Sequence, residues 1–298
     1  MHRNNKSSNN MKTQYLTSCS TEGLHHLAYT DWGSKDNPNI LVCSHGLTRN
    51  KHDFDALANK LSTERRVICF DLPGRGESDW LNDKSAYDYK QYIVDALMII
   101  ARTSANKIDW LGTSMGGLLG MMLASLENSP IKSLILNDVG PFIPKAALIR
   151  IANYVGKLPY YDTAQELENY MRTTYAGFGD LSDEQWKHLL RYGQKKLDNG
   201  QITLNYDPGV SLAFNHQPIE DIDLWSIWNN IQQRALIIRG ENSDLLARST
   251  TEQMLEQHPN AEFLEIPNTA HSPALMNNAD IHSIEQWLDK AEPNSFIV

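Results

Sequence analysis

The sequence predicts an α/β protein with a mostly parallel sheet, helices on both faces of that sheet, and one helical insertion. Short apolar runs rich in β-branched residues alternate with helix-like segments along most of the chain. Several runs, such as ILVC at 40–43, are apolar at successive positions, which is typical of strands covered on both faces. The alternation stops between about residues 142 and 230 and then resumes, which indicates an insertion into one α/β domain.

Each expected strand is an apolar run bounded by turn residues, and each expected helix is a longer segment between two strands. The strands cover residues 25–32, 40–44, 66–71, 108–113, 132–137, 234–239 and 262–266. The helices cover residues 52–61, 89–103, 115–127, 246–257 and 281–290. Pro130 and Pro259 each follow a helix, where proline prevents the helix from continuing.

The insertion is predicted to be mostly helical, and it holds half of the aromatic residues of the chain, 13 of 26. We expect most of these rings to pack the insertion. A minority, with Phe142, Trp225 and Trp228 as candidates, is expected to line a substrate pocket against the core. The core then comprises residues 21–141 and 231–298, and the insertion residues 142–230. The polar, Asn-rich start predicts disorder for residues 1–20.

Composition excludes several classes of function. The 298 residues carry a formal net charge of −9, which argues against nucleic-acid and anionic membrane partners. The start lacks the apolar segment of a secretory signal, and the longest uncharged stretch, 110–126, is short for a membrane span and interrupted by Gly, Ser and Thr. Of the three cysteines, Cys43 and Cys69 are expected to be buried strand thiols rather than a disulfide framework. These features favour a cytoplasmic location.

The segment GTSMG at 112–116 matches the G-x-S-x-G motif and places a serine between an apolar strand and an apolar helix. In this motif the serine stands on a strained strand-to-helix turn, where the flanking chains pass close together. Gly112 and Gly116 supply the small residues that such a turn needs. The turn also aims the serine at the N-terminus of the helix, whose partial positive charge favours a developing anion. Ser114 is therefore the predicted nucleophile.

A serine hydroxyl needs a neighbouring base, and that base needs an orienting carboxylate. The motif comes with the chain order serine, acid, histidine. His271 lies in a loop directly after the last expected strand and is the predicted base. The other histidines after the serine fall in the insertion or beside helices: His188, His216, His258 and His282.

The acid is expected at the carboxyl edge of the sheet, where ligands gather in open α/β sheets. Asp244 follows the strand ALIIRG and is the predicted acid. Asp138, in LNDVGP, also follows a strand and is the alternative, with Glu241 a third. If Asp244 is the acid, Asp138 is expected to cap the turn that enters the insertion.

Acyl transfer builds negative charge on a carbonyl oxygen, which needs two fixed N–H donors. The segment SHGL at 44–47 follows a strand, and its glycine lets the backbone turn beside the nucleophile. The backbone N–H groups of Leu47 and Met115 are the predicted donors of this oxyanion hole. His45 is expected to orient the loop rather than act as the base. Because the sequence holds no H-E-x-x-H, zinc-type cysteine pair or G-x-G-x-x-G, we expect neither a metal nor an organic cofactor.

The motifs SHGLTRN, DLPGRGESD, GTSMGG, NDVGP, RGENSDLL and NTAHSP stand in an order that resembles bacterial α/β-hydrolases of the carboxylesterase and enol-lactonase type. The resemblance covers about residues 25–290 and implies the α/β-hydrolase fold with a helical cap. It implies that DLPGRGESD is a structural loop, and some members place the acid one strand earlier, which keeps Asp138 open. Epoxide hydrolases and haloalkane dehalogenases of this fold carry an aspartate where this chain has Ser114.

The expected reaction is two-step acyl transfer on a small, mainly apolar carboxylic ester or lactone. A carbon–carbon bond hydrolase and a thioesterase would use the same three residues, so both remain alternatives. From another class, the chain could be a small-molecule receptor on a hydrolase scaffold. The sequence does not fix the physiological substrate or the oligomeric state, because the motifs specify machinery rather than substrate.

Overall fold

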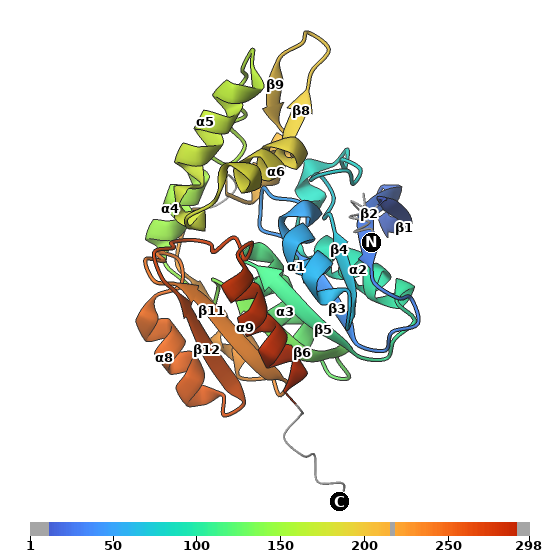
Figure 1. The fold of residues 1–298 in the computed structure, drawn as a ribbon, viewed down its shortest axis with the longest axis vertical. Helices are drawn as coiled ribbons and strands as arrows, with labels where there is room; N and C mark the ends of the chain where they lie inside the picture. The colour runs from blue at the N-terminus through green and yellow to red at the C-terminus, as the bar shows by residue number, and fades with distance from the viewer. Residues whose placement is uncertain (1–11, 215–217, 291–298) are drawn as a thin grey trace, which may run out of the picture.

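The computed structural model describes residues 12–214 and 218–290, and its centre is an eight-stranded sheet (Figure 1). The β1–β2 and β2–β4 pairs are antiparallel, and every other neighbouring pair in the sheet is parallel. In spatial order the strands are β1 (Gln14–Ser20), β2 (Gly23–Trp32), β4 (Arg66–Phe70), β3 (Ile40–Ser44), β5 (Ile108–Thr113), β6 (Ile131–Asn137), β11 (Arg234–Gly240) and β12 (Ala261–Ile266).

Helices cover both faces of this sheet, as the apolar runs predict. Successive residues of β3 alternate between two hydrophobic clusters: Ile40 and Val42 belong to one, and Leu41 and Cys43 to the other. The first cluster includes residues of α2 (Tyr89–Arg102), α3 (Met115–Ala124) and α8 (Arg248–Gln257). The second includes residues of α1 (Asp55–Leu61) and α9 (Asn278–Asp289). The predicted α/β fold is therefore confirmed.

The insertion combines helices with short strands. Figure 1 shows its longer helices and a hairpin gathered at the top of the view, above the sheet. Capping boxes begin α5 and α6. The side chains of Thr163 and Ser182 each accept a hydrogen bond from the backbone N–H three residues on, and their own backbone N–H groups donate to the side chain of that residue. Its elements are β7 (Phe142–Ile143), α4 (Lys145–Ala152), α5 (Ala164–Thr174), α6 (Asp183–Gly193), β8 (Gln194–Lys196), β9 (Ile202–Leu204), β10 (Ile222–Asp223) and α7 (Trp225–Trp228).

Short 3-10 helices complete the described chain, at Lys51–Phe54, Lys84–Ala86, Ala176–Phe178 and Pro208–Phe214. The first of them precedes α1, so the single helix predicted for 52–61 is divided in two. The expected strands all lie within two residues of their predicted bounds. Cys43 and Cys69 are buried, unpaired neighbours on β3 and β4, as predicted.

Two predictions about secondary structure are wrong. The sequence predicts disorder up to residue 20, yet Gln14–Ser20 forms β1 and pairs along its whole length with β2. The sequence also predicts no strand in the insertion, yet β8 pairs with β9 and β7 with β10. In each case pairing with a neighbouring strand supplies order that local composition does not indicate. The expectations for residues 1–11 and for His216 lie outside the described residues.

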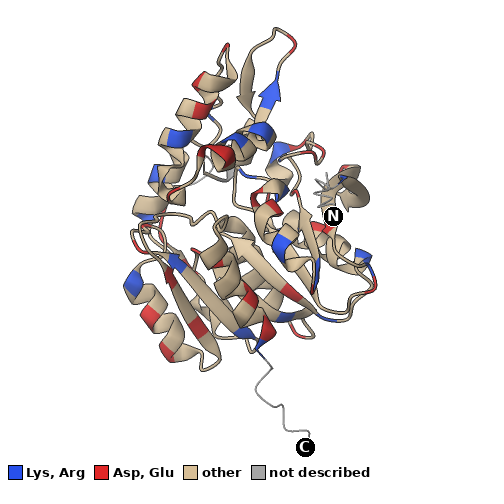
Figure 2. Ribbon diagram, viewed as in Figure 1, with Lys and Arg blue, Asp and Glu red and all other residues tan. Residues whose placement is uncertain are grey.

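Charged residues of both signs are interspersed over the helices of the core and the insertion (Figure 2). None of the helices in the described part of the chain is long and apolar enough to cross a membrane.

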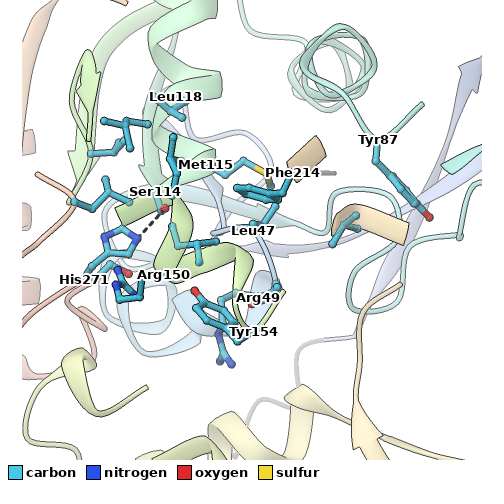
Figure 3. Close-up of a pocket in the computed structure, with 18 of the residues that line it drawn as sticks. Leu47, Arg49, Tyr87, Ser114, Met115, Leu118, Arg150, Tyr154, Phe214 and His271 are labelled. Carbon is cyan, nitrogen blue, oxygen red and sulfur yellow. Dashed lines mark hydrogen bonds between the residues drawn. The ribbon is translucent and has the colours of Figure 1, made fainter. Parts of the chain in front are cut away.

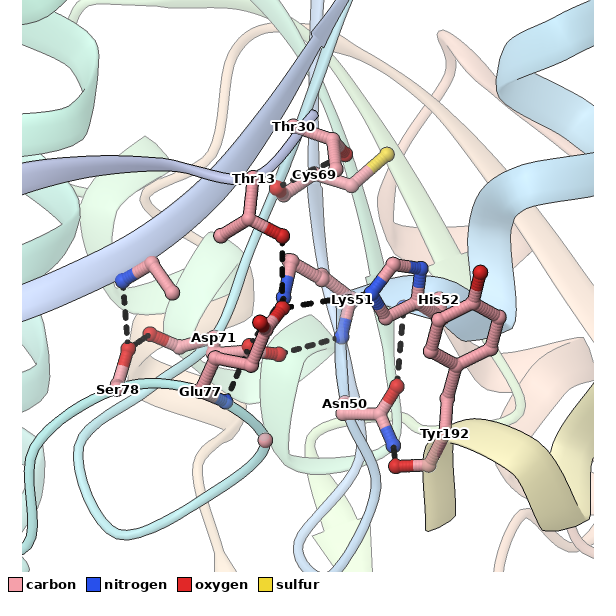
Figure 4. A network of polar contacts seen from close by, with 12 residues as sticks. Thr13, Thr30, Asn50, Lys51, His52, Cys69, Asp71, Glu77, Ser78 and Tyr192 are labelled. Carbon is pink, nitrogen blue, oxygen red and sulfur yellow. Dashed lines mark hydrogen bonds and ion pairs between the residues drawn. The ribbon is translucent and has the colours of Figure 1, made fainter. Parts of the chain in front are cut away.

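A buried lysine lies at the junction of the sheet and the loop after β4 (Figure 4). Lys51 has no exposed surface, and its Nζ lies 2.8 Å from Asp71 Oδ2 and 2.5 Å from Glu77 Oε2. Burial disfavours the ammonium ion, but the two carboxylates outweigh burial and raise the pKa of Lys51. Glu77 also accepts a hydrogen bond from Thr13, so the pair ties the start of the described chain to the core.

The residues beside Lys51 attach the insertion to the core. Asn50 Nδ2 donates to the carbonyl of Tyr192 at 3.1 Å, and the Tyr192 ring stacks on His52 with centroids 3.6 Å apart (Figure 4). His188 Nε2 lies 2.9 Å from the carbonyl oxygen of His52. Helix α6 is therefore fixed to the segment that follows β3.

Candidate active site

Ser114 stands on the turn between β5 and α3 with φ 51° and ψ −115°, a strained backbone conformation for a residue with a side chain. The chains around it are in close contact. A Cβ on Gly112 would lie 2.1 Å from the Gly116 carbonyl oxygen, and a Cβ on Gly116 would lie 2.2 Å from the Ser44 carbonyl oxygen. Only glycine fits at these two positions, so the turn has the geometry that the motif predicts.

Ser114, His271 and Asp138 form a hydrogen-bonded row. The distance from His271 Nε2 to Ser114 Oγ is 3.0 Å, and the distance from His271 Nδ1 to Asp138 Oδ2 is 2.7 Å. Figure 3 shows the first of these bonds inside a cavity. The Asp138 side chain is fully buried and that of His271 is 10% exposed, so little water competes for either bond. This arrangement allows the imidazole to take the serine proton while the carboxylate holds its tautomer.

The prediction of Asp244 as the acid is wrong in this geometry. Its carboxylate lies 2.5 and 2.8 Å from the Arg150 guanidinium, and its side chain is 48% exposed. The alternative, Asp138, follows β6 with a positive φ of 58° that turns its side chain toward His271. The third candidate, Glu241, accepts from the backbone N–H of Asn268 instead. Asp138 therefore contacts the histidine rather than capping the entry to the insertion.

Two donors from neighbouring loops hold the Asp138 carboxylate in place. The backbone N–H of Gly240 donates to Oδ1 at 2.8 Å, and the Ser243 hydroxyl donates to Oδ2 at 2.7 Å. The loop after β11, where the acid was predicted, thus supports the carboxylate of the neighbouring strand. These two bonds fix the orientation of the Asp138 carboxylate toward His271.

The two residues predicted to supply oxyanion donors lie close to Ser114. Met115 begins α3, and both Leu47 and Met115 line the same cavity as Ser114 (Figure 3). Neither backbone N–H donates a hydrogen bond to a group in the described part of the chain. A Cβ on Gly46 would lie 3.7 Å from Ser114 Cβ, so the loop passes directly beside the serine. The two N–H groups are thus available to an anion next to Ser114.

Two buried side chains position this loop. His45 donates through Nδ1 to the Gly46 carbonyl at 2.7 Å and accepts from the Leu72 N–H at 3.1 Å. Burial lowers the pKa of His45 to about 4, so its imidazole is neutral near pH 7 and structural, as predicted. Arg75, which the sequence analysis did not single out, is fully buried and donates to the Leu47 carbonyl at 2.9 Å.

The cavity above Ser114 and His271 has a volume of about 410 Å³ and is lined mainly by apolar and aromatic side chains. The three aromatic residues predicted to line it do not. Trp228 is fully buried and packs beside His258, with ring centroids 5.1 Å apart. Phe142 and Trp225 also lie outside the lining. The aromatic residues that do line the cavity from the insertion are Tyr154, Tyr175, Phe178 and Phe214.

The lining is also charged, which the sequence analysis did not predict. Arg49, Lys84 and Arg150 contribute to it, against one carboxylate, Asp88. The whole chain carries a net charge of −9, so an excess of cations in the cavity runs against the overall balance. Nothing in the residue pattern marks these three cations, because they come from three separate segments. Each of these cations is paired with a carboxylate that does not itself line the cavity: Asp53, Asp207 and Asp244 respectively.

Over residues 12–214 and 218–290, no group of three or more His, Cys, Asp or Glu side chains is arranged to hold a metal ion.

Comparisons with known proteins agree with the fold and the motifs. Residues 39–277 match the family model of the alpha/beta hydrolase fold. The 3-hydroxybutyrate-oligomer hydrolase of Cupriavidus necator is 39% identical over 285 residues, which cover 93% of this chain and 97% of that protein.

Solved structures are similar over nearly the whole chain. A crystal structure of a Rickettsia typhi protein has a TM-score of 0.89 and 36% identity, covering 95% of this chain and 100% of that one. An alpha/beta hydrolase from Novosphingobium aromaticivorans has a TM-score of 0.82 and 29% identity, covering 94% of this chain and 99% of the other. The chain therefore belongs to the α/β-hydrolase family and is a hydrolase of that type.

Proposed function

We propose that this protein hydrolyses short oligoesters of a 3-hydroxy carboxylic acid, with Ser114 as nucleophile, His271 as base and Asp138 as the supporting acid. The observation that carries this proposal is the hydrogen-bonded row from Ser114 Oγ through His271 to Asp138, in a mainly apolar cavity whose lining includes three cationic side chains. The 39% identity to an oligomer hydrolase over nearly the full length supports the substrate class. Such oligoesters are apolar along the chain and carry a carboxylate at one end.

The first half of the proposed reaction forms an acyl-enzyme. Ser114 Oγ attacks the ester carbonyl carbon while its proton passes to His271 Nε2. The carbonyl oxygen becomes an oxyanion and accepts from the N–H groups of Leu47 and Met115; losing one such donor typically costs about 3 kcal/mol of barrier. Collapse of the intermediate expels the alkoxide, which takes the proton from the imidazolium. The leaving group is one hydroxy acid or a shorter oligomer, and it is released with a new hydroxyl group.

The second half releases the acyl group. A water molecule gives its proton to His271 and attacks the acyl carbon, and the imidazolium returns that proton to Ser114 as the ester bond breaks. The product is a free carboxylic acid. Asp138 keeps the Nδ1 proton in place throughout and stabilises the imidazolium.

Purified full-length protein incubated with the dimer and trimer of 3-hydroxybutyrate tests the proposal. We expect monomer to accumulate, measured by chromatography, at a rate well above that with butyryl-CoA, a lactone or a vinylogous diketone. Ser114→Ala, with the same fold by circular dichroism, should release none above background. If the thioester or the diketone is turned over and the oligomers are not, the proposed substrate class is wrong.

A fluorophosphonate probe separates an enzyme from a receptor on the same scaffold. The probe should label wild-type protein covalently and should not label Ser114→Ala. Labelling without turnover of any ester in the panel would favour the receptor.

A further inference from the structure

The three cations of the cavity differ in what holds them. Arg49 is 6% exposed and binds Asp53 through both Nε and Nη2, at 2.9 and 2.6 Å. Its guanidinium also lies 5.0 Å from the ring centroid of Tyr175 and 5.6 Å from that of Phe178. We expect Arg49 to stay with this partner, because releasing it would leave the largely buried Asp53 carboxylate, 19% exposed, without its counter-ion.

Lys84 is committed in the same way. Its Nζ bonds the carbonyl of Leu81 and the carboxylate of Asp207, whose side chain is 2% exposed. Tyr87 donates to the same carboxylate at 2.7 Å. Drawing Lys84 toward a substrate would strip a buried carboxylate of its counter-ion.

Arg150 differs, because its partner lies at the surface. The Asp244 side chain is 48% exposed and can be solvated by water if Arg150 turns to another anion. Arg150 uses Nε and Nη2 in this pair, and its own side chain is 42% exposed at the edge of the cavity. A surface ion pair contributes only about 0–1 kcal/mol, so exchanging one carboxylate for another costs little. Figure 3 shows Arg150 with the residues that line the cavity.

We propose that Arg150 binds the free carboxylate of the substrate and that Asp244 occupies the guanidinium until substrate displaces it. This inference rests on the proposed function. In an oligoester of a hydroxy acid, the free carboxylate belongs to the unit that leaves as the alcohol. Arg150 would then select esters at a fixed distance from the carboxyl end. Each hydrolysis gives the retained part a new carboxylate, so the shortened oligomer is again a substrate.

The test compares one substrate in two charge states: the 3-hydroxybutyrate dimer as the free acid and as its methyl ester. The readout is the ratio of kcat/KM for the acid to kcat/KM for the methyl ester. In Arg150→Gln this ratio should fall by about 10- to 100-fold, the range expected for hydrogen bonds to a charged group. The matched control is Lys145→Gln, which removes one positive charge from the same helix at a position outside the cavity lining. Its ratio should stay at the wild-type value.

Asp244→Asn provides a second, opposite test that does not depend on how Arg150→Gln folds. Without the competing carboxylate, the ratio should rise by up to about 5-fold, the strength of a surface ion pair. A fall in this ratio for Asp244→Asn would mean that Asp244 only positions Arg150. An unchanged ratio in both Arg150→Gln and Asp244→Asn would mean that the pair does not contact substrate. Either result overturns the inference while leaving the proposed function intact. Wild-type protein that cleaves neither form of the dimer would instead refute the proposed function.

Discussion

Replacing Asp138 with asparagine tests the proposed catalytic row most directly, because the structure fixes which way the new amide faces. Asp138 Oδ1 accepts from the Gly240 N–H, and Oδ2 accepts from His271 Nδ1. An asparagine must keep its carbonyl oxygen toward Gly240, since an amide N–H cannot accept from a backbone N–H. Its NH₂ group then faces His271 and donates to Nδ1. The imidazole is forced into the tautomer with a proton on Nε2, which cannot accept the proton of Ser114.

Such a tautomer change costs on the order of 10⁴ in kcat in serine hydrolases with this arrangement, or about 5.5 kcal/mol of barrier. We expect Asp138→Asn to lose about that factor in steady-state hydrolysis of p-nitrophenyl butyrate, with little change in KM. The same substitution at Asp244 should keep kcat within about 3-fold, because Asp244 bonds Arg150 and not the imidazole, and a surface ion pair is worth little. A kcat for Asp138→Asn within ten-fold of wild type, or a collapse only in Asp244→Asn, would refute the assignment.

Three further predictions concern the same region. Ser114→Ala should lose on the order of 10⁴-fold or more in kcat, measured with the same ester; residual turnover near wild type would contradict its role. Gly116→Ala should lower the melting temperature strongly or prevent folding, because its Cβ would meet the Ser44 carbonyl at 2.2 Å. Gly193→Ala, whose Cβ would lie 3.3 Å from the flexible end of Met171 and 3.8 Å from Arg49 Nη1, is the control and should melt near wild type. His45 has a pKa lowered to about 4 by burial, so the unfolded chain binds its proton first as the pH falls. Wild-type stability should therefore drop by roughly 3 kcal/mol between about pH 6.5 and pH 4, and a chemical-denaturation series should show a shallower drop in His45→Gln.

Much of the core could be predicted from the sequence because a strand covered on both faces leaves a plain signal. The runs at β3 (ILVC), β6 (LIL) and β11 (LII) are apolar at successive positions, and the structure places these strands in the centre of the sheet, with β5 between β3 and β6. Ser114 and His271 could be found for a related reason. Ser114 stands between a strand and a helix and His271 in the loop after the last strand, and the motif glycines at 112 and 116 mark the turn that carries the serine.

The choice of acid could not be made from the sequence. Asp138 and Asp244 both follow parallel strands, β6 and β11, that are neighbours in the sheet and end at the same edge. Which carboxylate reaches His271 depends on one backbone dihedral angle, the positive φ of Asp138, and on donors from the loop after β11. The pattern of residues in the sequence indicates neither this dihedral angle nor these donors.

The residues that line the cavity also could not be predicted from the sequence, because the lining depends on how the insertion packs against the core. Trp228 is an aromatic residue of the insertion, the type expected to line the pocket. It is instead fully buried, beside α3 and the end of α8. The sequence does not predict strand β1, because only one of its seven residues is buried and its order comes from pairing with β2. Tertiary contacts decide both outcomes.

The attachment of α6 to the segment after β3 has a consequence for engineering. Asn50 and His52 hold α6 through the backbone and ring of Tyr192, only a few residues beyond Leu47, which carries one of the proposed oxyanion donors. The insertion is thus not an interchangeable module. A chimera that swaps residues 142–230 alone would leave that stretch of core without its counterpart and shift the donor with it. Transplants between relatives should carry residues 45–55 along with the insertion.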